Sequence, residues 1–520
     1  MLPGLILLAA LALAVLAALA SLVLLAPGGG SGLPDPAYLS AIAGFTALQA
    51  SLSALISLAL GAAIALALAR RAFWGRRLFL GLLGVATSLP AIVAIFAIAA
   101  IFGRSGFVNT ALAGIGLPRF SIYGLPGILI AHVFFNAAFA TRVYLAAIEA
   151  IPGEHWRLAA SLGMPPFALF RLVDLPVLRR ETPGLALLVF IACATSFAIP
   201  LTLGGGPASA TFEVAIYQAI HFDVDFGRAA GLALLQIAAM ATLVTLAAPL
   251  LNRPLETAVA GRRVERPDRD GLPLRLFDAV VLALALGLFL PPLLSLAAGV
   301  PALAAVPARE TLSATLLSLV IAAAAAGLAL FCAYTLSQSR IALAQAGHRR
   351  ASRALALAPL LILAVPPLAF AAGLYVLARR LGDPAAIGVP VLILINAMMA
   401  LPFVHRLVEA PLSVAASRYG RLAASLGMGA LARLRLVEAP LLAGPAGAAF
   451  AFAMALSLGD LGVVALFGSS SLVTLPALLY ARLGAYRMEE AQGIAALLAG
   501  LVLLLFLAAE RAGRRHADPL

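Results

Sequence analysis

Asp460 is the carboxylate that lies deepest inside an apolar stretch, in the segment AMALSLGDLGVVALFG. An ionisable side chain within a membrane-spanning segment is costly, and it usually faces a cavity or a transport route. We therefore predict that Asp460 lines a substrate pathway together with Ser457, where a carboxylate would favour a cationic solute. The alternative is that Asp460 only accepts hydrogen bonds from backbone groups near the outer membrane interface.

The other reactive residue types are not arranged for catalysis. All 35 basic residues are Arg, because the sequence contains no Lys, and this excludes both a P-loop nucleotide site and a lysine Schiff base. Cys193 and Cys332 lie in apolar runs and are expected to be inert core residues, and the six His show no metal-ligand spacing. We expect no enzymatic activity, no metal and no cofactor, so any ATP that drives this protein is hydrolysed by another chain.

The elements that hold these residues are predicted to be membrane-spanning helices. Hydrophobic residues make up 63% of the chain and charged residues 11%, with a mean hydropathy of +1.07. Apolar runs of about 20 residues suffice for a helix to cross a hydrocarbon layer of about 30 Å. The expected fold is an all-α polytopic membrane protein with about twelve spans, near 4–26, 49–69, 78–102, 124–148, 184–204, 229–251, 274–299, 311–335, 354–378, 388–408, 443–467 and 492–509. The first run lacks a basic N-terminal region, so we expect a retained helix rather than a signal peptide.

The formal charge of +13 reflects topology rather than a nucleic-acid partner. The arginines gather in alternate turns between the expected spans, as the positive-inside rule predicts for cytoplasmic loops. The first outside turn, residues 27–38, carries no basic residue, and only ARRLGDP (378–384) departs from the pattern. Both termini are therefore expected to lie in the cytoplasm, and the bulk of the chain in a lipid bilayer.

One phrase, RLAASLGM, stands at residues 157–164 and again at 421–428. With a constant offset of 264 positions, residues 157–176 and 421–440 are identical at 13 of 20 positions. This indicates a tandem duplication of six spans, and an even number of spans orients both copies in the same direction. We divide the chain into a first permease repeat at 1–252, a cytoplasmic linker at 253–273 and a second repeat at 274–520.

Two further pairs of polar residues lie in corresponding spans of the two halves. Ser196 stands at the position equivalent to Asp460, so a pathway lined there would be asymmetric. Asn136 and Asn396 lie in the fourth span of each half, where an interhelical hydrogen bond is the expected role.

Both copies of the phrase fall in an inside loop between the fourth and fifth spans of their half. Leu158 and Leu162 are four residues apart, like Leu422 and Leu426 in the second copy, and each pair shares a helical face. The glycine that follows suits the left-handed position that ends a helix. We expect each loop to form a short helix, a glycine turn and a second short helix on the cytoplasmic surface. Two matched apolar surfaces indicate two matched partners.

The loops resemble the EAA loops of bacterial ABC importer permeases, here at 149–182 and 410–440. The pattern is matched at Ala159, Gly163 and Pro176 in the first copy and at Ala423, Gly427 and Pro440 in the second. The sequence departs from the pattern at its first two positions, which are Arg157 and Leu158 in the first copy and Arg421 and Leu422 in the second. Both copies keep a carboxylate near the end, Asp174 and Glu438. The resemblance implies two ATP-binding subunits on the cytoplasmic side, into which these loops dock, a periplasmic solute-binding protein, and a bacterial inner membrane. The resemblance does not imply a salt bridge made by the family's Glu, because Arg157 and Arg421 stand at that position here.

Two longer stretches, 201–236 and 457–491, are similar to thiamine ABC importer permeases of the fused twelve-span type. The implied function is ATP-driven import of thiamine or its phosphates by alternating access. Iron(III) importer permeases share the fusion and the EAA loops, so iron(III) remains the alternative solute. A secondary transporter with six plus six spans is the alternative from another class.

The turns expected on the outside carry acidic and aromatic side chains. Such residues could attract a cationic, aromatic solute such as thiamine. The alternative, which we favour, is docking of the binding protein. The candidate residues are Glu213, Tyr217, Asp223 and Asp225 in the first half, and Tyr480, Tyr486, Glu489 and Glu490 in the second.

Overall fold

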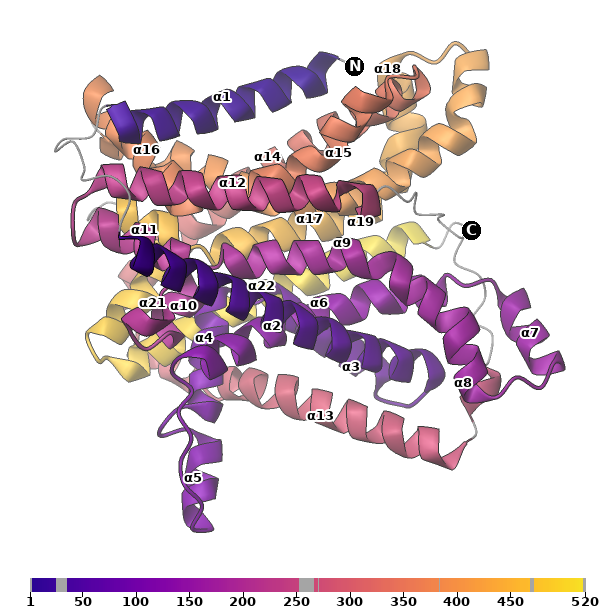
Figure 1. Cartoon of the computed structure of the whole chain (residues 1–520), viewed down its shortest axis with the longest axis horizontal. Helices are drawn as coiled ribbons and strands as arrows, with labels where there is room; N and C mark the ends of the chain where they lie inside the picture. The colour runs from indigo at the N-terminus through magenta and orange to yellow at the C-terminus, as the bar shows by residue number, and fades with distance from the viewer. Residues whose placement is uncertain are drawn as a thin grey trace.

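The computed structural model describes residues 2–24, 35–251, 266–269, 271–382, 384–467 and 472–517 (Figure 1). Within these residues the chain is helical and contains no β-strand, which confirms the all-α prediction. The first half forms α1 Leu2–Leu24, α2 Pro36–Arg70, α3 Arg76–Ser88, α4 Ala91–Phe102, α5 Phe107–Gly114, α6 Leu125–Glu149, α7 Gly153–Ser161, α8 Pro166–Leu169, η1 Phe170–Asp174, α9 Leu175–Ala194, α10 Ala198–Leu203, η2 Pro207–Ser209, α11 Phe212–His221 and α12 Phe226–Leu251.

The second half begins with part of the linker. It forms η3 Pro267–Arg269, α13 Leu272–Ala297, η4 Val300–Ala305, α14 Ala308–Gln345, α15 Arg349–Leu363, α16 Pro367–Leu381, α17 Pro384–Ser425, α18 Ala430–Arg433, η5 Leu434–Glu438, α19 Ala439–Leu458, α20 Gly462–Phe467, α21 Leu475–Gly484 and α22 Met488–Ala517.

Ten helical segments among the described residues are long and apolar enough to cross a membrane, or eleven if the bent pair α15 and α16 counts as one span. The expected number of twelve is therefore not confirmed. The expected fifth span is α9, which carries Arg179, Arg180 and Glu181 within its 20 residues. It is absent from that group of apolar helices, although it packs against α2 and α6 inside the bundle.

The segment that the sequence repeats at an offset of 264 also has a repeated backbone structure. α8 begins at Pro166 and α18 at Ala430, while α9 ends at Ala194 and α19 at Leu458, so both boundaries lie 264 positions apart. A five-residue π-helical turn, η1 or η5, joins the short helix to the long one in both copies. The same residue pattern therefore produces the same local backbone in each half.

The first helix of each half packs against the opposite half. α1 lies along α14 and α16, and α13 lies along α2, α3 and α4 (Figure 1). Gly373 of α16 permits one such approach, since a Cβ there would come within 2.1 Å of the Ala18 backbone oxygen. The Ser21 hydroxyl donates to the Gly373 carbonyl across the same contact, at 2.5 Å. The two sequence halves are therefore interlocked rather than adjacent.

Candidate functional site

A cavity of about 290 Å³ lies between the two halves, where four spans are interrupted. The interruptions are Leu89–Pro90 between α3 and α4, Thr195–Phe197 between α9 and α10, Ala364–Pro366 between α15 and α16, and Gly459–Leu461 between α19 and α20. Proline accounts for two of them, because Pro lacks the N–H group of a helical hydrogen bond and disfavours helix in the residue before it. Each interruption contributes residues to the cavity or directly borders one that does, so the cavity is built around the helix breaks.

The predicted pathway residues are brought together at this cavity. Asp460, Ser457 and Ser196 all belong to its lining, as do Asn136 and Asn396. The three predicted pathway residues, Asp460, Ser457 and Ser196, therefore lie at one cavity, and their role in transport stays a prediction.

Both asparagines make the expected interhelical hydrogen bonds. The Asn396 amide donates to the Ser457 hydroxyl at 2.8 Å, and the Asn136 amide donates to the Cys193 sulfur at 3.3 Å. Cys193 and Ser457 are equivalent positions in the 264-residue repeat, so each half ties its fourth span to its fifth by a similar contact. The cavity walls are thus held by matched polar pairs.

Asp460 is incompletely satisfied by the protein. Its Oδ1 accepts a long hydrogen bond, 3.4 Å, from the backbone N–H of Val463 at the start of α20. Its Oδ2 is buried and has no hydrogen-bond partner among the described residues. A buried acceptor without a partner is costly, and a ligand that donates a proton or carries a positive charge would relieve that cost.

The structure adds Glu213 to the cavity and removes it from the docking surface. Its side chain is fully buried and accepts a hydrogen bond from Gln236 at 3.1 Å, while its Oε2 has no partner among the described residues. The prediction that Glu213 docks a binding protein is therefore wrong. Its neighbours Phe212, Val214 and Ile216 are all apolar and buried, and this local pattern could have indicated burial.

His132 is a second cavity residue that the sequence did not reveal. Its Nδ1 lies 3.1 Å from the Ser53 hydroxyl, and its Nε2 is buried with no partner among the described residues. With Glu213 and Asp460, it gives the cavity three polar side chains that each have a hydrogen-bonding atom without a partner in the described part of the chain. They come from α6, α11 and the α19–α20 break, so both halves contribute.

The remaining residues of the expected docking surface lie at the end of the bundle near α11 and α21 (Figure 1). Asp223 is exposed and pairs with Arg228 at 3.1 Å, whereas Asp225 accepts from the Arg228 backbone N–H at 2.9 Å and so caps α12. Tyr486 and Glu489 are exposed near the start of α22. Asp223, Tyr486 and Glu489 are therefore exposed to a partner, whereas Asp225 is partly buried and lies two residues from Asp223.

Tyr217 is only partly available on this surface. Its ring stacks on His221 with centroids 5.1 Å apart and also contacts Phe197 at 5.1 Å. Because Phe197 lines the cavity, Tyr217 connects the outer surface to the pathway.

The two loops that resemble EAA loops, 149–182 and 410–440, are the predicted coupling loops. They lie at the opposite end of the bundle, where α7, α8 and α18 are seen in Figure 1. Gly163 and Gly427 have φ of +58° and +62°, as the sequence predicted. In each copy the following methionine N–H, Met164 or Met428, donates to an alanine carbonyl five residues earlier, at 3.1 Å and 3.0 Å. This is a Schellman turn that ends the helix, and glycine adopts its left-handed position without strain.

An apolar face is exposed beside each turn. Leu158 is 60% exposed and Leu422 is 55% exposed, while the alanines at 159 and 423 are buried against the bundle. Arg157 and Arg421 are exposed, as are Pro176 and Pro440 at the start of α9 and α19, whereas Asp174 and Glu438 are buried. Each loop thus exposes a leucine and an arginine at equivalent positions and buries one carboxylate.

Two comparisons with known proteins found relatives of this chain. A family model described as "Binding-protein-dependent transport system inner membrane component" matches residues 57–260. The thiamine transport system permease protein ThiP of Brucella melitensis biotype 1 is 43% identical, over 98% of this chain and 95% of that protein. The proteins of the same name from Salmonella typhimurium and Escherichia coli K12 are each 41% identical, over 99% and 92% of this chain and 97% and 90% of their own lengths. The similarity to these relatives spans both repeats.

Proposed function

This chain belongs to the family of thiamine transport system permease proteins, and from this premise we propose that it forms the transmembrane pathway of an ATP-driven importer for thiamine or its phosphates. As a permease it is a multi-pass inner-membrane transport subunit rather than an enzyme. Two ATP-binding subunits on separate chains bind the coupling loops from the cytoplasmic side, where both termini also lie. A periplasmic solute-binding protein delivers the solute at the opposite end.

The observation that carries the proposal is the cavity between the halves, with the free carboxylate oxygens of Asp460 and Glu213 in its lining. Thiamine carries a thiazolium cation and two aromatic rings. The carboxylates offer charge to the cation, and Phe135, Phe139, Phe197 and Phe403 of the same lining offer ring faces. A site of this kind favours a cationic aromatic solute over a hard metal ion, which would require several oxygen ligands.

The transport cycle follows from the placement of the parts. ATP binding brings the two ATPase subunits together, and the coupling loops transmit this movement to the spans that they join. The helix breaks around the cavity are the points at which the spans can bend. The cavity then opens outward to receive thiamine and, after hydrolysis, inward to release it, with no covalent chemistry in this chain.

The proposal is tested by Asp460→Asn in proteoliposomes that contain the permease, the ATPase subunits and the thiamine-loaded binding protein. Loss of the charge should lower thiamine uptake about tenfold, equivalent to about 1.4 kcal/mol of lost interaction. Glu213→Gln should lower uptake in the same direction. The control is Asp35→Asn, because Asp35 is exposed at the start of α2 and belongs neither to the cavity lining nor to the expected docking surface.

Complex assembly should be unchanged in the Asp460 variant, as judged by co-purification of the ATPase subunits. Normal thiamine uptake by both cavity variants would show that these carboxylates do not favour the cation. If the wild type carries iron(III) but not thiamine, the substrate assignment falls while the transporter assignment stands.

A further inference from the structure

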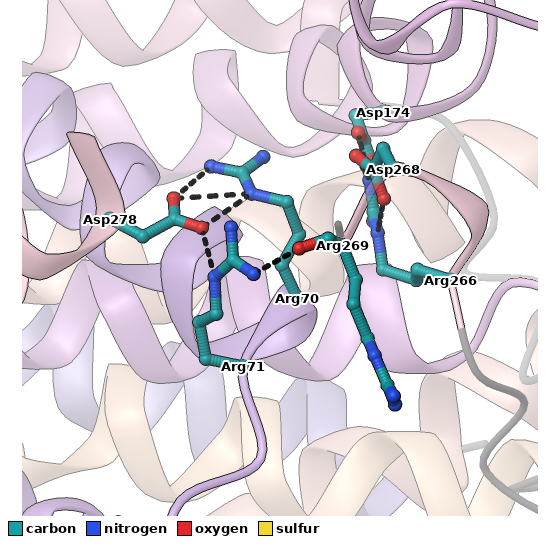
Figure 2. Close-up of polar contacts among 7 residues, drawn as sticks. All are labelled: Arg70, Arg71, Asp174, Arg266, Asp268, Arg269 and Asp278. Carbon is teal, nitrogen blue, oxygen red and sulfur yellow. Dashed lines mark hydrogen bonds and ion pairs between the residues drawn. The ribbon is translucent and has the colours of Figure 1, made fainter. Parts of the chain in front are cut away.

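A buried ionic cluster connects the linker between the repeats to the first coupling loop (Figure 2). The Arg266 guanidinium donates two parallel hydrogen bonds to Asp174, from Nη1 at 2.8 Å and from Nη2 at 2.7 Å. It also donates to both oxygens of Asp268, from Nε at 3.0 Å and from Nη2 at 2.9 Å. The Arg266, Asp174 and Asp268 side chains are 4%, 0% and 2% exposed, so the cluster is shielded from water.

The same guanidinium also covers an aromatic ring of the coupling helix α7. Its central carbon lies 4.2 Å from the ring centroid of Trp156, which is buried with Ala159 and Leu169 in a small apolar cluster. A guanidinium over an indole face is a favourable cation–π geometry. Arg266 therefore contacts both ends of the first coupling loop, α7 through Trp156 and the π-helical turn η1 through Asp174.

The electrostatics keep this arginine charged. Burial alone lowers the pKa of the Arg266 guanidinium, but the hydrogen bonds and charges of Asp174 and Asp268 outweigh burial and raise that pKa above its ordinary value. Removing the guanidinium would leave two carboxylates facing each other in a buried position, which is unfavourable.

The described linker residues 266–269 also contact the C-terminus of α2, through Arg269. Arg71 donates to the backbone carbonyl of Arg269, and it also pairs with Asp278 of α13 at 2.7 Å (Figure 2). Arg70 pairs with the same carboxylate at 2.6 Å. We call residues 266–269 together with Asp278 the linker clasp. It joins the first coupling loop, the end of α2 and the first helix of the second repeat.

The second coupling loop is supported in another way. Its buried carboxylate, Glu438, accepts from the Tyr334 hydroxyl at 2.6 Å, the Gln338 amide at 2.6 Å and the Arg433 Nε at 2.7 Å. Gly420 occupies the position of Trp156, so this copy has no indole to cover. Its coupling helix is the C-terminal end of α17, which runs without interruption from Pro384 to Ser425.

The first coupling helix has no such continuous support. α6 ends at Glu149, and α7 begins at Gly153 after Pro152, so a joint separates the membrane span from the coupling helix. Because this joint separates α7 from α6, the orientation of α7 must be set by contacts with other elements. Among the described residues, the linker clasp provides the charged part of these contacts.

We propose that Arg266 is a positioning residue, and that the linker clasp holds the first coupling helix in the orientation in which it engages its ATPase subunit. The clasp also makes α7 move together with α2 and α13, so that ATPase closure at the first loop reaches the second repeat directly. This inference rests on the proposed function, because it assigns Arg266 a role in coupling to an ATPase.

The test compares Arg266→Gln with wild type in proteoliposomes containing the ATPase subunits and the thiamine-loaded binding protein. The number of thiamine molecules imported per ATP hydrolysed should fall at least fivefold in Arg266→Gln while ATP hydrolysis continues. Arg266→Lys keeps the charge without the planar fork and should give an intermediate ratio. A purely structural role would lower transport and hydrolysis together and leave the ratio unchanged.

A matched control is Arg76→Gln, which removes an ion pair of similar length, 2.7 Å to Glu149, near the same joint. Its ratio should stay within twofold of wild type. The triple variant Asp174→Asn/Arg266→Gln/Asp268→Asn leaves no unpaired charge among these three residues and so protects the fold, but it should also lower the ratio.

Hydrogen exchange of the isolated permease separates this inference from the proposed function. Arg266→Gln should raise amide exchange in residues 153–161 and leave residues 417–425 unchanged. The role of the clasp would be overturned if Arg266→Gln raised exchange equally in residues 153–161 and 417–425, or raised it in neither. A wild-type number of thiamine molecules imported per ATP in both Arg266 variants would also overturn it. If wild type does not couple thiamine import to ATP, the proposed function falls, and the exchange measurement still decides whether Arg266 positions α7.

Discussion

The two coupling loops share one turn and differ in what holds them. In both, a Schellman glycine ends the coupling helix and a π-helical turn leads into the next span. The first loop is separated from its membrane helix by a joint at Pro152 and is held by a charged cluster from the linker. The second continues its membrane helix and is held mainly by α14. The surface presented to the partner is thus duplicated, while its support is not.

This difference shows which features a duplication retains. The exposed leucines and the glycine turn must fit two partners of the same kind, so both copies need the same outer geometry. The inner contacts only have to hold that geometry in place, and chemically different contacts can do so. We therefore expect changes at the shared turn to act equally in both loops, and changes at the supports to act unequally.

The largest effect is expected from Gly163→Pro and Gly427→Pro, which remove the shared turn. Proline cannot adopt φ of +58° or +62°, and it lacks the N–H that Gly163 and Gly427 donate to Ala160 and Ala424 at 3.1 Å. A penalty of about 3 kcal/mol should reduce thiamine uptake on the order of 100-fold in either variant. Uptake in proteoliposomes, with ATPase co-purification as the control for assembly, measures this. Wild-type uptake in both variants would refute the coupling role of the turns.

An effect that differs between the two loops is expected at the buried carboxylates. Asp174→Asn breaks a buried, bidentate pair with Arg266 and should cost about 3 kcal/mol in the free energy of unfolding. Glu438→Gln keeps hydrogen-bonding partners in Tyr334 and Gln338, and it loses only the charge opposite a half-exposed Arg433, so about 1 kcal/mol is expected. Unfolding of the detergent-solubilised protein by denaturant compares the two. A larger loss for Glu438→Gln would contradict the assigned supports.

The smallest effect is expected at the two exposed arginines. Arg157 has a weak contact, 3.8 Å, with the exposed Glu154, and Arg421 is also exposed. Reversal to Glu at one of these positions should weaken ATPase binding in detergent by about 0.5–1 kcal/mol, and by similar amounts in the two loops. Unchanged assembly in detergent combined with poorer membrane insertion would instead assign these arginines to lipid headgroups.

Much of the coupling-loop geometry could be predicted from the sequence. The spacing of the leucines and the glycine after them were enough to predict a helix with a left-handed end, because both depend on local backbone preferences. The expected separate short helix is found as α7 in the first loop, but the prediction is wrong for the second loop, where the helix is the end of α17. The all-α fold and the repeat followed from apolar run lengths and from the phrase at 157–164. The packing of α1 and α13 against the opposite halves did not, because an apolar helix does not reveal which apolar neighbour it contacts.

The residues that the sequence missed were those whose roles depend on distant partners. Arg266 stands in a basic linker and resembles any solvated arginine, yet it binds Asp174, which is 92 positions away. Glu213 was assigned to an outside turn on the basis of loop charge, but its partner Gln236 and its burial depend on how α11 packs on α12. The expected number of spans is also not confirmed among the described residues, because α9 carries three charges and other spans are broken.

Import of thiamine driven by ATP is tested most directly by uptake of labelled thiamine into proteoliposomes that contain this permease, its ATPase subunits and the binding protein. Uptake should require hydrolysable ATP and both partners, and excess unlabelled thiamine should suppress it whereas iron(III) should not. Uptake driven by a proton or sodium gradient in the absence of ATP would contradict ATP-driven import and identify the protein as a secondary transporter.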